Sequence, residues 1–255
     1  MDVKYIFCIS TGRSGTGYLA SLLKCLKSSS VFHEHKPILN GLPMQEYLKG
    51  NFELMQTEIP KKIEVIKNFK ENIYIDTSHL FIKGFGWEIP KYINQEEIGI
   101  IILKRDRKKV VDSTMKVHSG PFSYFGRKWI ITPRRKNIVL PPIRYDHYIL
   151  YYLLLKFFWI LIGKNKTIKK VYPSYFKKIS KKLLYWYIDE TEALCQKYMI
   201  KFDRIKYVEV NLEDLNNFEG VIKIADAFDL SKSFNQECLK DKLGKFINEK
   251  KHFKA

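Results

Sequence analysis

The sequence is short of acidic residues, and it lacks several signals that mark specialised classes of protein. Asp and Glu number 27 against 45 Lys and Arg, which gives a formal net charge of +18 over 255 residues. That excess attracts polyanions, although a solvated lysine-rich surface accounts for most of it. We find no signal peptide, internal repeat or low-complexity tract. We therefore expect one globular domain over residues 1–255.

Cysteine is also scarce. The four cysteines are Cys8, Cys25, Cys195 and Cys238, and none is spaced as C-x-x-C. We expect all four to be reduced and mostly buried, as in a cytoplasmic protein.

No apolar run reaches the length of about 18 residues that a membrane-spanning helix needs. The longest is "YILYYLLLKFFWILI" at residues 148–162, and Lys156 interrupts it. We interpret it as a buried or half-buried helix. The alternative is peripheral membrane contact through residues 144–170. The head-group contacts would then come from basic residues, namely Arg144, Lys164, Lys166, Lys169 and Lys170.

Short apolar runs alternate with helical patterns along the chain. Strands are predicted at residues 3–9, 30–33, 72–77, 97–103 and 205–211. Helices are predicted at residues 18–27, 60–71, 106–116, 148–162, 173–199, 218–228 and 235–249. The proline-containing segment 118–143 is predicted to be a loop or lid. This alternation predicts an α/β fold, a parallel β-sheet flanked by helices, with ligands at the carboxyl ends of the strands.

The stretch "STGRSGTG" follows the first predicted strand and precedes a helix, which is the arrangement of a phosphate-binding loop. Backbone N–H groups and the positive end of the helix would face the anion, and Arg13 adds a fixed charge. The ATP-binding form of this loop ends in Gly-Lys-Ser or Gly-Lys-Thr. Here it ends in Gly17-Tyr18-Leu19, without the lysine and without the hydroxyl that holds magnesium. A P-loop nucleotide kinase is therefore the weaker alternative.

A second basic motif ends the predicted strand 97–103. Arg105 stands at the strand end, and Ser113 lies about two turns into the next helix. An arginine and a hydroxyl so placed can hold a second phosphate. Taken alone, "KRDRKK" is better interpreted as a basic, solvated helix start.

Together the two motifs resemble the sulfotransferases of the carbohydrate type that use 3′-phosphoadenosine 5′-phosphosulfate (PAPS). Arg13-Ser14-Gly15-Thr16 matches the motif that holds the 5′-phosphosulfate, and Arg105 with Ser113 matches the one that holds the 3′-phosphate. The resemblance covers residues 1–117 and is loose beyond them. One departure is Gly17-Tyr18, where family members often carry threonine and an aromatic or aliphatic residue.

The resemblance implies a P-loop-NTPase-like sulfotransferase fold, PAPS as co-substrate and no metal. The implied nucleotide contacts are Thr11, Gly12, Arg13, Ser14, Gly15, Thr16, Gly17, Tyr18, Arg105 and Ser113.

A base for the acceptor hydroxyl is expected beside the loop. "SVFHEHKP" supplies His33, Glu34 and His35 at the end of the second predicted strand. The resemblance implies that a glutamate or a histidine in this neighbourhood takes the proton. We choose Glu34, because strand alternation would turn it away from both histidines, which remain the alternatives. "DTSHLF" adds Ser78 and His79 as substrate or proton-relay groups, or equally as strand-end caps.

The expected reaction transfers a sulfuryl group from PAPS to a hydroxyl of a carbohydrate or glycolipid and releases adenosine 3′,5′-bisphosphate. Arg13 and the loop N–H groups would stabilise the leaving group. Residues 118–170 would form a lid, an acceptor wall or a membrane-proximal insertion, with Tyr124 and Trp129 able to stack on a sugar. The basic runs leave nucleic-acid binding as an alternative, but no nucleic-acid fold signature accompanies them. A protein that binds PAPS without turnover is a further alternative.

Overall fold

The computed structural model describes residues 2–117, 119–133, 137–161 and 166–245. The strands are β1 (Tyr5–Ile9), β2 (Ser29–Phe32), β3 (Ile73–Asp76), β4 (Ile98–Lys104) and β5 (Lys206–Asn211). The helices of the N-terminal half are α1 (Thr16–Leu23), α2 (Leu42–Lys49), α3 (Glu53–Lys67), α4 (Arg107–Lys116) and α5 (Tyr124–Trp129). The remaining helices are α6 (Tyr145–Leu161), α7 (Lys166–Lys201), α8 (Phe218–Ala227) and α9 (Gln236–Lys242).

The five strands form one parallel sheet in the order β2-β3-β1-β4-β5. Tyr5 of β1 lies opposite Tyr74 of β3 and Ile98 of β4, so β1 occupies the centre. The predicted α/β fold with a parallel, helix-flanked sheet is confirmed. The narrower assignment to a P-loop-NTPase-like sulfotransferase fold stays a prediction.

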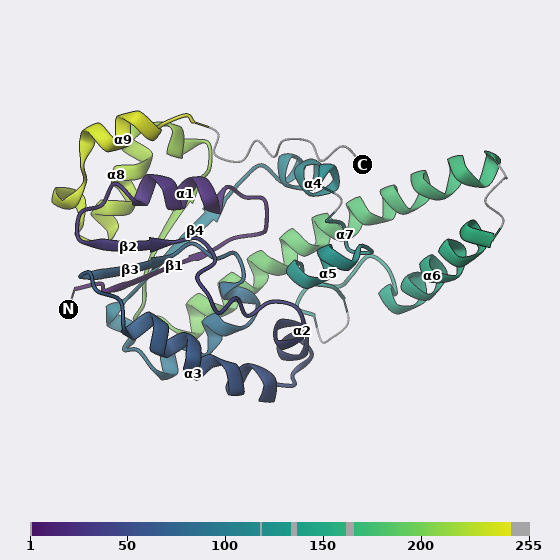
Figure 1. Ribbon diagram of the computed structural model, residues 1–255, viewed down its shortest axis with the longest axis horizontal. Coiled ribbons are helices and arrows are strands. Elements are labelled where there is room, and N and C mark those ends of the chain that lie inside the picture. Colours follow the sequence, from purple (N-terminus) through teal and green to yellow (C-terminus); the bar gives the residue numbers. More distant parts are fainter. Residues whose placement is uncertain (1, 118, 134–136, 162–165, 246–255) are drawn as a thin grey trace.

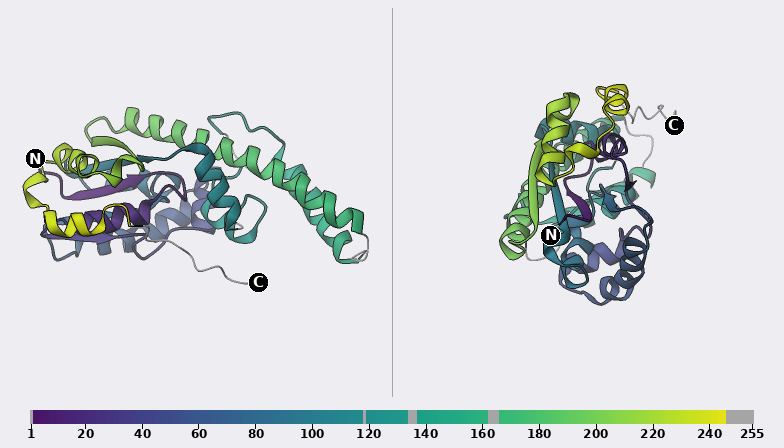
Figure 2. Two further views of the ribbon diagram at one scale, coloured as in Figure 1. Left: turned by 90° about the horizontal axis from the view of Figure 1, so that it is seen from above. Right: turned by 90° about the vertical axis from the view of Figure 1, so that its left-hand side faces the viewer.

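Helices cover both faces of the sheet, as Figure 1 and the end-on view in Figure 2 show. Alternate residues of β1 face opposite layers: Ile6 and Cys8 pack with α1, α8 and α9, whereas Phe7 and Ile9 pack with α3 and α7. Strand β4 is buried on both faces along nearly its whole length. Such burial explains its unbroken apolar run "IGIIIL".

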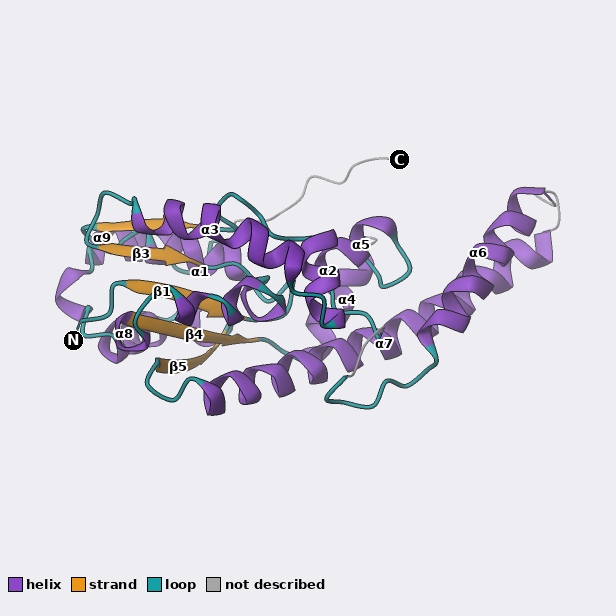
Figure 3. Ribbon diagram, turned by 90° about the horizontal axis from the view of Figure 1, so that it is seen from below, coloured by secondary structure: helices purple, strands orange, loops and turns teal. Residues whose placement is uncertain are grey.

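The long helix α7 serves two parts of the molecule. Its C-terminal half packs on the sheet through side chains such as Leu184, Tyr187 and Leu194. Its N-terminal half runs past the sheet and carries α6 alongside it (Figures 1 and 3). Among the described residues, no helix combines the length and apolar character that crossing a membrane requires.

Two helices were not predicted from the sequence. Helix α5 lies inside the segment 118–143 that was expected to be a loop, and the Ser123 hydroxyl caps it by accepting from the Gly126 N–H. Helix α2 is a short element bounded by Gly41 and Gly50. Both are near the lower limit of helix length, where tertiary packing decides more than local pattern.

The predicted bounds of other helices also change. Helix α3 is Glu53–Lys67 and contains Pro60, whereas the predicted helix covered residues 60–71. Helix α7 begins at Lys166, well before the predicted start at residue 173. Helix α9 ends at Lys242. Residues 246–249 of the last predicted helix lie outside the described part of the chain.

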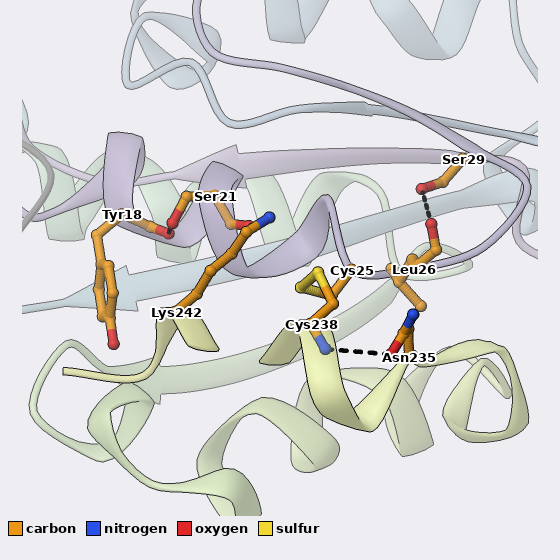
Figure 4. The surroundings of a disulfide bond; sticks show 8 residues. All are labelled: Tyr18, Ser21, Cys25, Leu26, Ser29, Asn235, Cys238 and Lys242. Atoms are coloured by element: carbon orange, nitrogen blue, oxygen red, sulfur yellow. Dashed lines mark hydrogen bonds between the residues drawn. A yellow bond between two sulfur atoms is a disulfide. The ribbon is translucent and has the colours of Figure 1, made fainter. Parts of the chain in front are cut away.

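The expectation of four reduced cysteines is wrong for two of them. Cys25, just after α1, forms a disulfide with Cys238 of α9, with Cα atoms 5.6 Å apart (Figure 4). The two residues are separated by 213 positions in the sequence, so their spacing gave no sign of the pairing. Cys8 and Cys195 are free and buried, as expected. The cytoplasmic location loses the support of the cysteine argument and stays a prediction.

Candidate active site

The glycine-rich loop after β1 has the backbone geometry of an anion cradle. Arg13 and Gly15 both adopt left-handed backbone conformations, with φ of 69° and 93°. Gly15 is the N-cap of α1, and no described side chain caps the helix start. The N–H groups of the first helical turn are therefore directed at the space that an anion would fill.

The position of Gly15 leaves no room for a side chain. A Cβ atom there would lie 2.4 Å from Cδ1 of Leu212, which follows β5. Beside it, Thr11 Oγ1 and Ser14 Oγ lie 2.5 Å apart, so the two hydroxyls share a hydrogen bond. The loop thus lies close to Leu212 at Gly15 and has a hydrogen bond between its own hydroxyl groups.

The two predicted phosphate motifs meet in space. Arg13 Nε donates to Ser113 Oγ of α4 at 3.1 Å. Arg105, at the end of β4, donates from an Nη atom to the Arg13 carbonyl oxygen at 2.7 Å. Parallel strands β1 and β4 are neighbours, so their carboxyl ends bring the two arginines together.

The charges at this point are uncompensated. Among the described residues no carboxylate pairs with the guanidinium of Arg13 or of Arg105. Burial lowers the pKa of Arg13, and the positive charge of Arg105 lowers it further. Arg105 Nε is buried and has no hydrogen-bond partner in the described structure. Two crowded cations with an unused donor form a strong electrostatic site for an anion.

Glu34 lies on the other side of the loop, paired with His79. Its Oε1 atom is 3.3 Å from His79 Nε2. The reason given for choosing Glu34 was wrong in one respect: β2 ends at Phe32, so strand alternation does not orient it. A left-handed turn at Glu34 itself, with φ of 58°, directs its side chain. The His79 ring in turn lies about 3.5 Å from the place of a Cβ on Gly12, so the pair adjoins the loop.

Lys83 completes this group, and the sequence analysis gave it no role. Its side chain is fully buried, and its Nζ lies 2.8 Å from His79 Nδ1 and 2.7 Å from the Trp129 carbonyl oxygen. Burial lowers the pKa of Lys83 well below its usual range. Because the chain is rich in lysine, the sequence gives no reason to expect that Lys83 is buried and not exposed like most lysines. The only sequence feature that could have indicated its role is that Lys83 follows His79 by four residues, shortly after the predicted strand 72–77.

Tyr187 of α7 connects this group to the loop, and it was not predicted from the sequence either. Its hydroxyl accepts the Gly12 N–H at 3.0 Å, and Lys83 Nζ lies 4.9 Å from its ring centre. The loop, the buried lysine and the helix across the sheet are therefore one connected structure.

The pKa values in this group follow from burial and from close charges. Burial raises the pKa of Glu34, but the interaction with His79 and the charges of His79, His33 and Lys83 outweigh it, so the net shift is downward. Burial, then the charge of Lys83, lowers the pKa of His79 to about 4. At neutral pH the pair is a carboxylate beside a neutral imidazole. Lys83 faces Nδ1, so the ring proton belongs on Nε2, toward Glu34.

Both alternative bases lie outside this pair. The His35 ring stacks on Phe32 with centroids 3.6 Å apart, and its Nδ1 lies 3.0 Å from the Tyr74 hydroxyl. His33 is exposed and contacts the Thr77 hydroxyl through Nδ1 at 3.3 Å.

Two further candidates take structural positions. Ser78 Oγ accepts the Leu80 N–H, which is the strand-end cap that was weighed for it. The Tyr18 hydroxyl donates to the Leu215 carbonyl and accepts the Gly244 N–H, so it binds neighbouring chain segments. Trp129 stands near the site, with its ring 5.8 Å from that of His79, whereas Tyr124 is exposed on α5.

A cavity of about 330 Å³ lies beneath the loop, between the carboxyl ends of β1 and β4 and helix α7. Its lining includes Ser10, Thr11, Ser14 and Arg105 from the loop and strand ends, and Thr191 and Cys195 from α7. This cavity thus lies at the predicted edge of the sheet.

The described residues contain no group of three or more His, Cys, Asp or Glu side chains arranged to hold a metal ion. That a reaction here needs no metal stays a prediction.

Comparison with known proteins adds no assignment. No protein-family model matches the chain, and no curated protein matches it.

Proposed function

We propose that the protein is a PAPS-dependent sulfotransferase that acts on a hydroxyl of a carbohydrate or glycolipid. The observation that supports this most strongly is the contact between the two phosphate motifs. The loop arginine and the α4 serine are hydrogen bonded, and Arg105 binds the loop backbone. A nucleotide with two separate phosphate groups matches a site with two adjacent binding elements.

The residues present fit such a nucleotide. The loop N–H groups, the start of α1 and Arg13 would hold the 5′-phosphosulfate. Arg105, with its unused Nε donor, and Ser113 would hold the 3′-phosphate. Bound PAPS would supply an activated sulfuryl group at the mouth of the loop.

The chain's own residues would carry the proton and the charge. Glu34 would accept the proton of the acceptor hydroxyl, because it is a carboxylate beside the loop and is ionised at neutral pH. His79, held by Lys83 through Nδ1, would keep that carboxylate in place. Arg13 and the loop N–H groups would stabilise charge on the leaving phosphate. Residues 119–133, which reach the site at Trp129, would form part of the acceptor wall.

Ligand-induced stabilisation tests this proposal. Adenosine 3′,5′-bisphosphate without magnesium should raise the melting temperature, by a stabilisation of about 2.7 kcal/mol at a hundredfold excess over its Kd. Arg105→Ala should abolish the shift. Arg107→Ala is the matched control, because Arg107 is two positions away, pairs with Asp189 and is exposed.

The alternatives predict different results. A shift with magnesium ATP but none with the bisphosphate would overturn the proposal in favour of a kinase. A bisphosphate shift that Arg105→Ala leaves intact would show that the ligand binds elsewhere. Salt-dependent binding of DNA or RNA with no bisphosphate shift would favour a nucleic-acid partner.

A further inference from the structure

Helix α6 is apolar over most of its length, and among its described side chains those that pack in a hydrophobic core lie on one side. Tyr145, Ile149 and Tyr152, spaced by four and three residues, face α7. There they pack with Phe176 and Ile179. This seam is a separate small core outside the two that cover the sheet.

The other side of α6 presents large aliphatic side chains to solvent. Leu150, Leu153 and Leu154 are 60%, 50% and 47% exposed. Their spacing of three and four residues places them on one face of the helix. Contiguous aliphatic side chains on a projecting element mark a surface that docks on something apolar.

Basic residues are frequent on the elements that carry and adjoin this face. Arg144, Lys177, Lys178 and Lys182 are exposed on the residues that flank the seam. Between residues 137 and 182 the sequence carries a single acidic residue, Asp146. Its basic residues there are Arg144, Lys156, Lys164, Lys166, Lys169, Lys170, Lys177, Lys178, Lys181 and Lys182. An apolar face in a segment with ten basic residues and one acidic residue complements an anionic lipid surface.

We propose that α6 and residues 166–182 of α7, here called the arm, bind the surface of an anionic membrane. The outer face of α6 lies among the acyl chains at the interface, and the lysines contact anionic head groups. The arm lies on the bilayer and does not cross it, in keeping with the absence of a spanning helix among the described residues. Electrostatics disfavours a second copy as the occupant, because two arms of the same strong positive charge repel each other.

The arm suits this role in shape as well. It projects from the body along the axis of α7, so its outer face is reachable without moving the sheet (Figures 2 and 3). The proposal is independent of the reaction at the loop.

Vesicle flotation tests the proposal. The full-length protein should float with vesicles of equal parts phosphatidylglycerol and phosphatidylcholine, and should bind pure phosphatidylcholine much more weakly. Binding should weaken as salt is raised. Leu150→Ser with Leu154→Ser should weaken binding at least tenfold, because it removes apolar contact with the acyl chains. Separately, Lys177→Glu with Lys178→Glu should also weaken binding at least tenfold, because one lysine near the surface contributes about fivefold to the affinity.

Matched controls come from the opposite end of α7. Ile200 and Lys197 are exposed there, next to the body, and Ile200→Ser with Lys197→Glu should leave binding unchanged. Arg105→Ala should also leave it unchanged, which separates the arm from head-group binding at the loop.

Three results would overturn the proposal. One is no binding to anionic vesicles. A second is binding that the arm variants leave intact. The third is a concentration-dependent dimer, seen by light scattering, that the leucine variant dissociates, because the occupant would then be a second copy.

Discussion

Arg13 Nε and Ser113 Oγ lie 3.1 Å apart, although the two residues are 100 positions apart in the sequence. The contact joins the loop after β1 to the helix after β4, two neighbouring strands of the sheet. A ligand that binds both elements meets a site already assembled, so little ordering cost opposes binding.

The first prediction concerns the strength of this joint site. Arg13→Ala removes a charged donor and should weaken adenosine 3′,5′-bisphosphate binding about tenfold to a hundredfold, whereas Ser113→Ala removes a neutral partner and should cost about tenfold or less. Isothermal titration measures both. Lys108→Ala, exposed at the start of the same helix, is the control. An effect of Lys108→Ala as large as that of Arg13→Ala, with none for Ser113→Ala, would mean that only net charge matters.

The second prediction concerns the proton acceptor. Glu34→Gln should lower kcat by about 10²-fold to 10⁴-fold while leaving bisphosphate affinity nearly unchanged, because it removes the base and no phosphate contact. His35→Asn should leave kcat within a few fold, since that ring packs on Phe32. A large loss in His35→Asn with an active Glu34→Gln would reverse the assignment.

The third prediction concerns stability and pH. The pKa of His79 is about 4 in the folded protein, against about 6.5 for a free imidazole. Between these values the unfolded chain binds a proton that the native protein does not, so the free energy of unfolding falls as pH falls from 6.5 to 4. The full loss from this group is about 3 kcal/mol.

Urea unfolding across that pH range measures the effect. His79→Gln should flatten the slope, and His147→Asn, a change at an exposed position of α6, should not. An unchanged slope in His79→Gln would assign the acid sensitivity to other groups.

The fourth prediction concerns the backbone of the loop. Gly15→Ala should destabilise the protein by more than Gly50→Ala does. Both glycines have φ near 94°, but a Cβ meets Leu212 at Gly15 and nothing within 4 Å at Gly50. The left-handed conformation alone costs about 1–2 kcal/mol for alanine. Gly15→Ala should also weaken bisphosphate binding, and Gly50→Ala should not. Identical behaviour of the two variants would show that Leu212 adapts at no cost.

The fifth prediction concerns the disulfide. Cys25→Ser with Cys238→Ser should lower the free energy of unfolding by about 2–4 kcal/mol, because the bond restricts the unfolded chain. Reductant should lower the stability of the wild type to that of the variant and should not affect the variant further. A wild type indifferent to reductant would mean that the bond does not contribute in solution.

The sequence predicted well those features that depend on local pattern. Buried strands such as β4 are visible as apolar runs, and parallel topology follows from their alternation with helices. Arg13 and Arg105 were predicted because each follows a strand, and neighbouring strands bring such ends together. Ser113 was predicted from its spacing after Arg105, and the structure brings it to Arg13.

Features that depend on distant packing were missed for a physical reason. Lys83 is buried because Trp129 and Tyr187, from segments far along the chain, close over it. The pairing of Cys25 with Cys238 likewise depends on α9 packing against α1, which no spacing reveals. Helix α2 gains its stability from contacts with α3, not from its own short sequence.

The disulfide also turns the segment from Cys25 to Cys238 into a covalent ring. A protease cut at one exposed loop of that ring, such as the turn at Asp203 and Arg204 between α7 and β5, would divide the backbone without dividing the molecule. The strands β1 to β4 on one fragment and β5 on the other would stay tethered through α1 and α9. Their pairing would then depend on the effective concentration set by that tether, and dilution would not separate them.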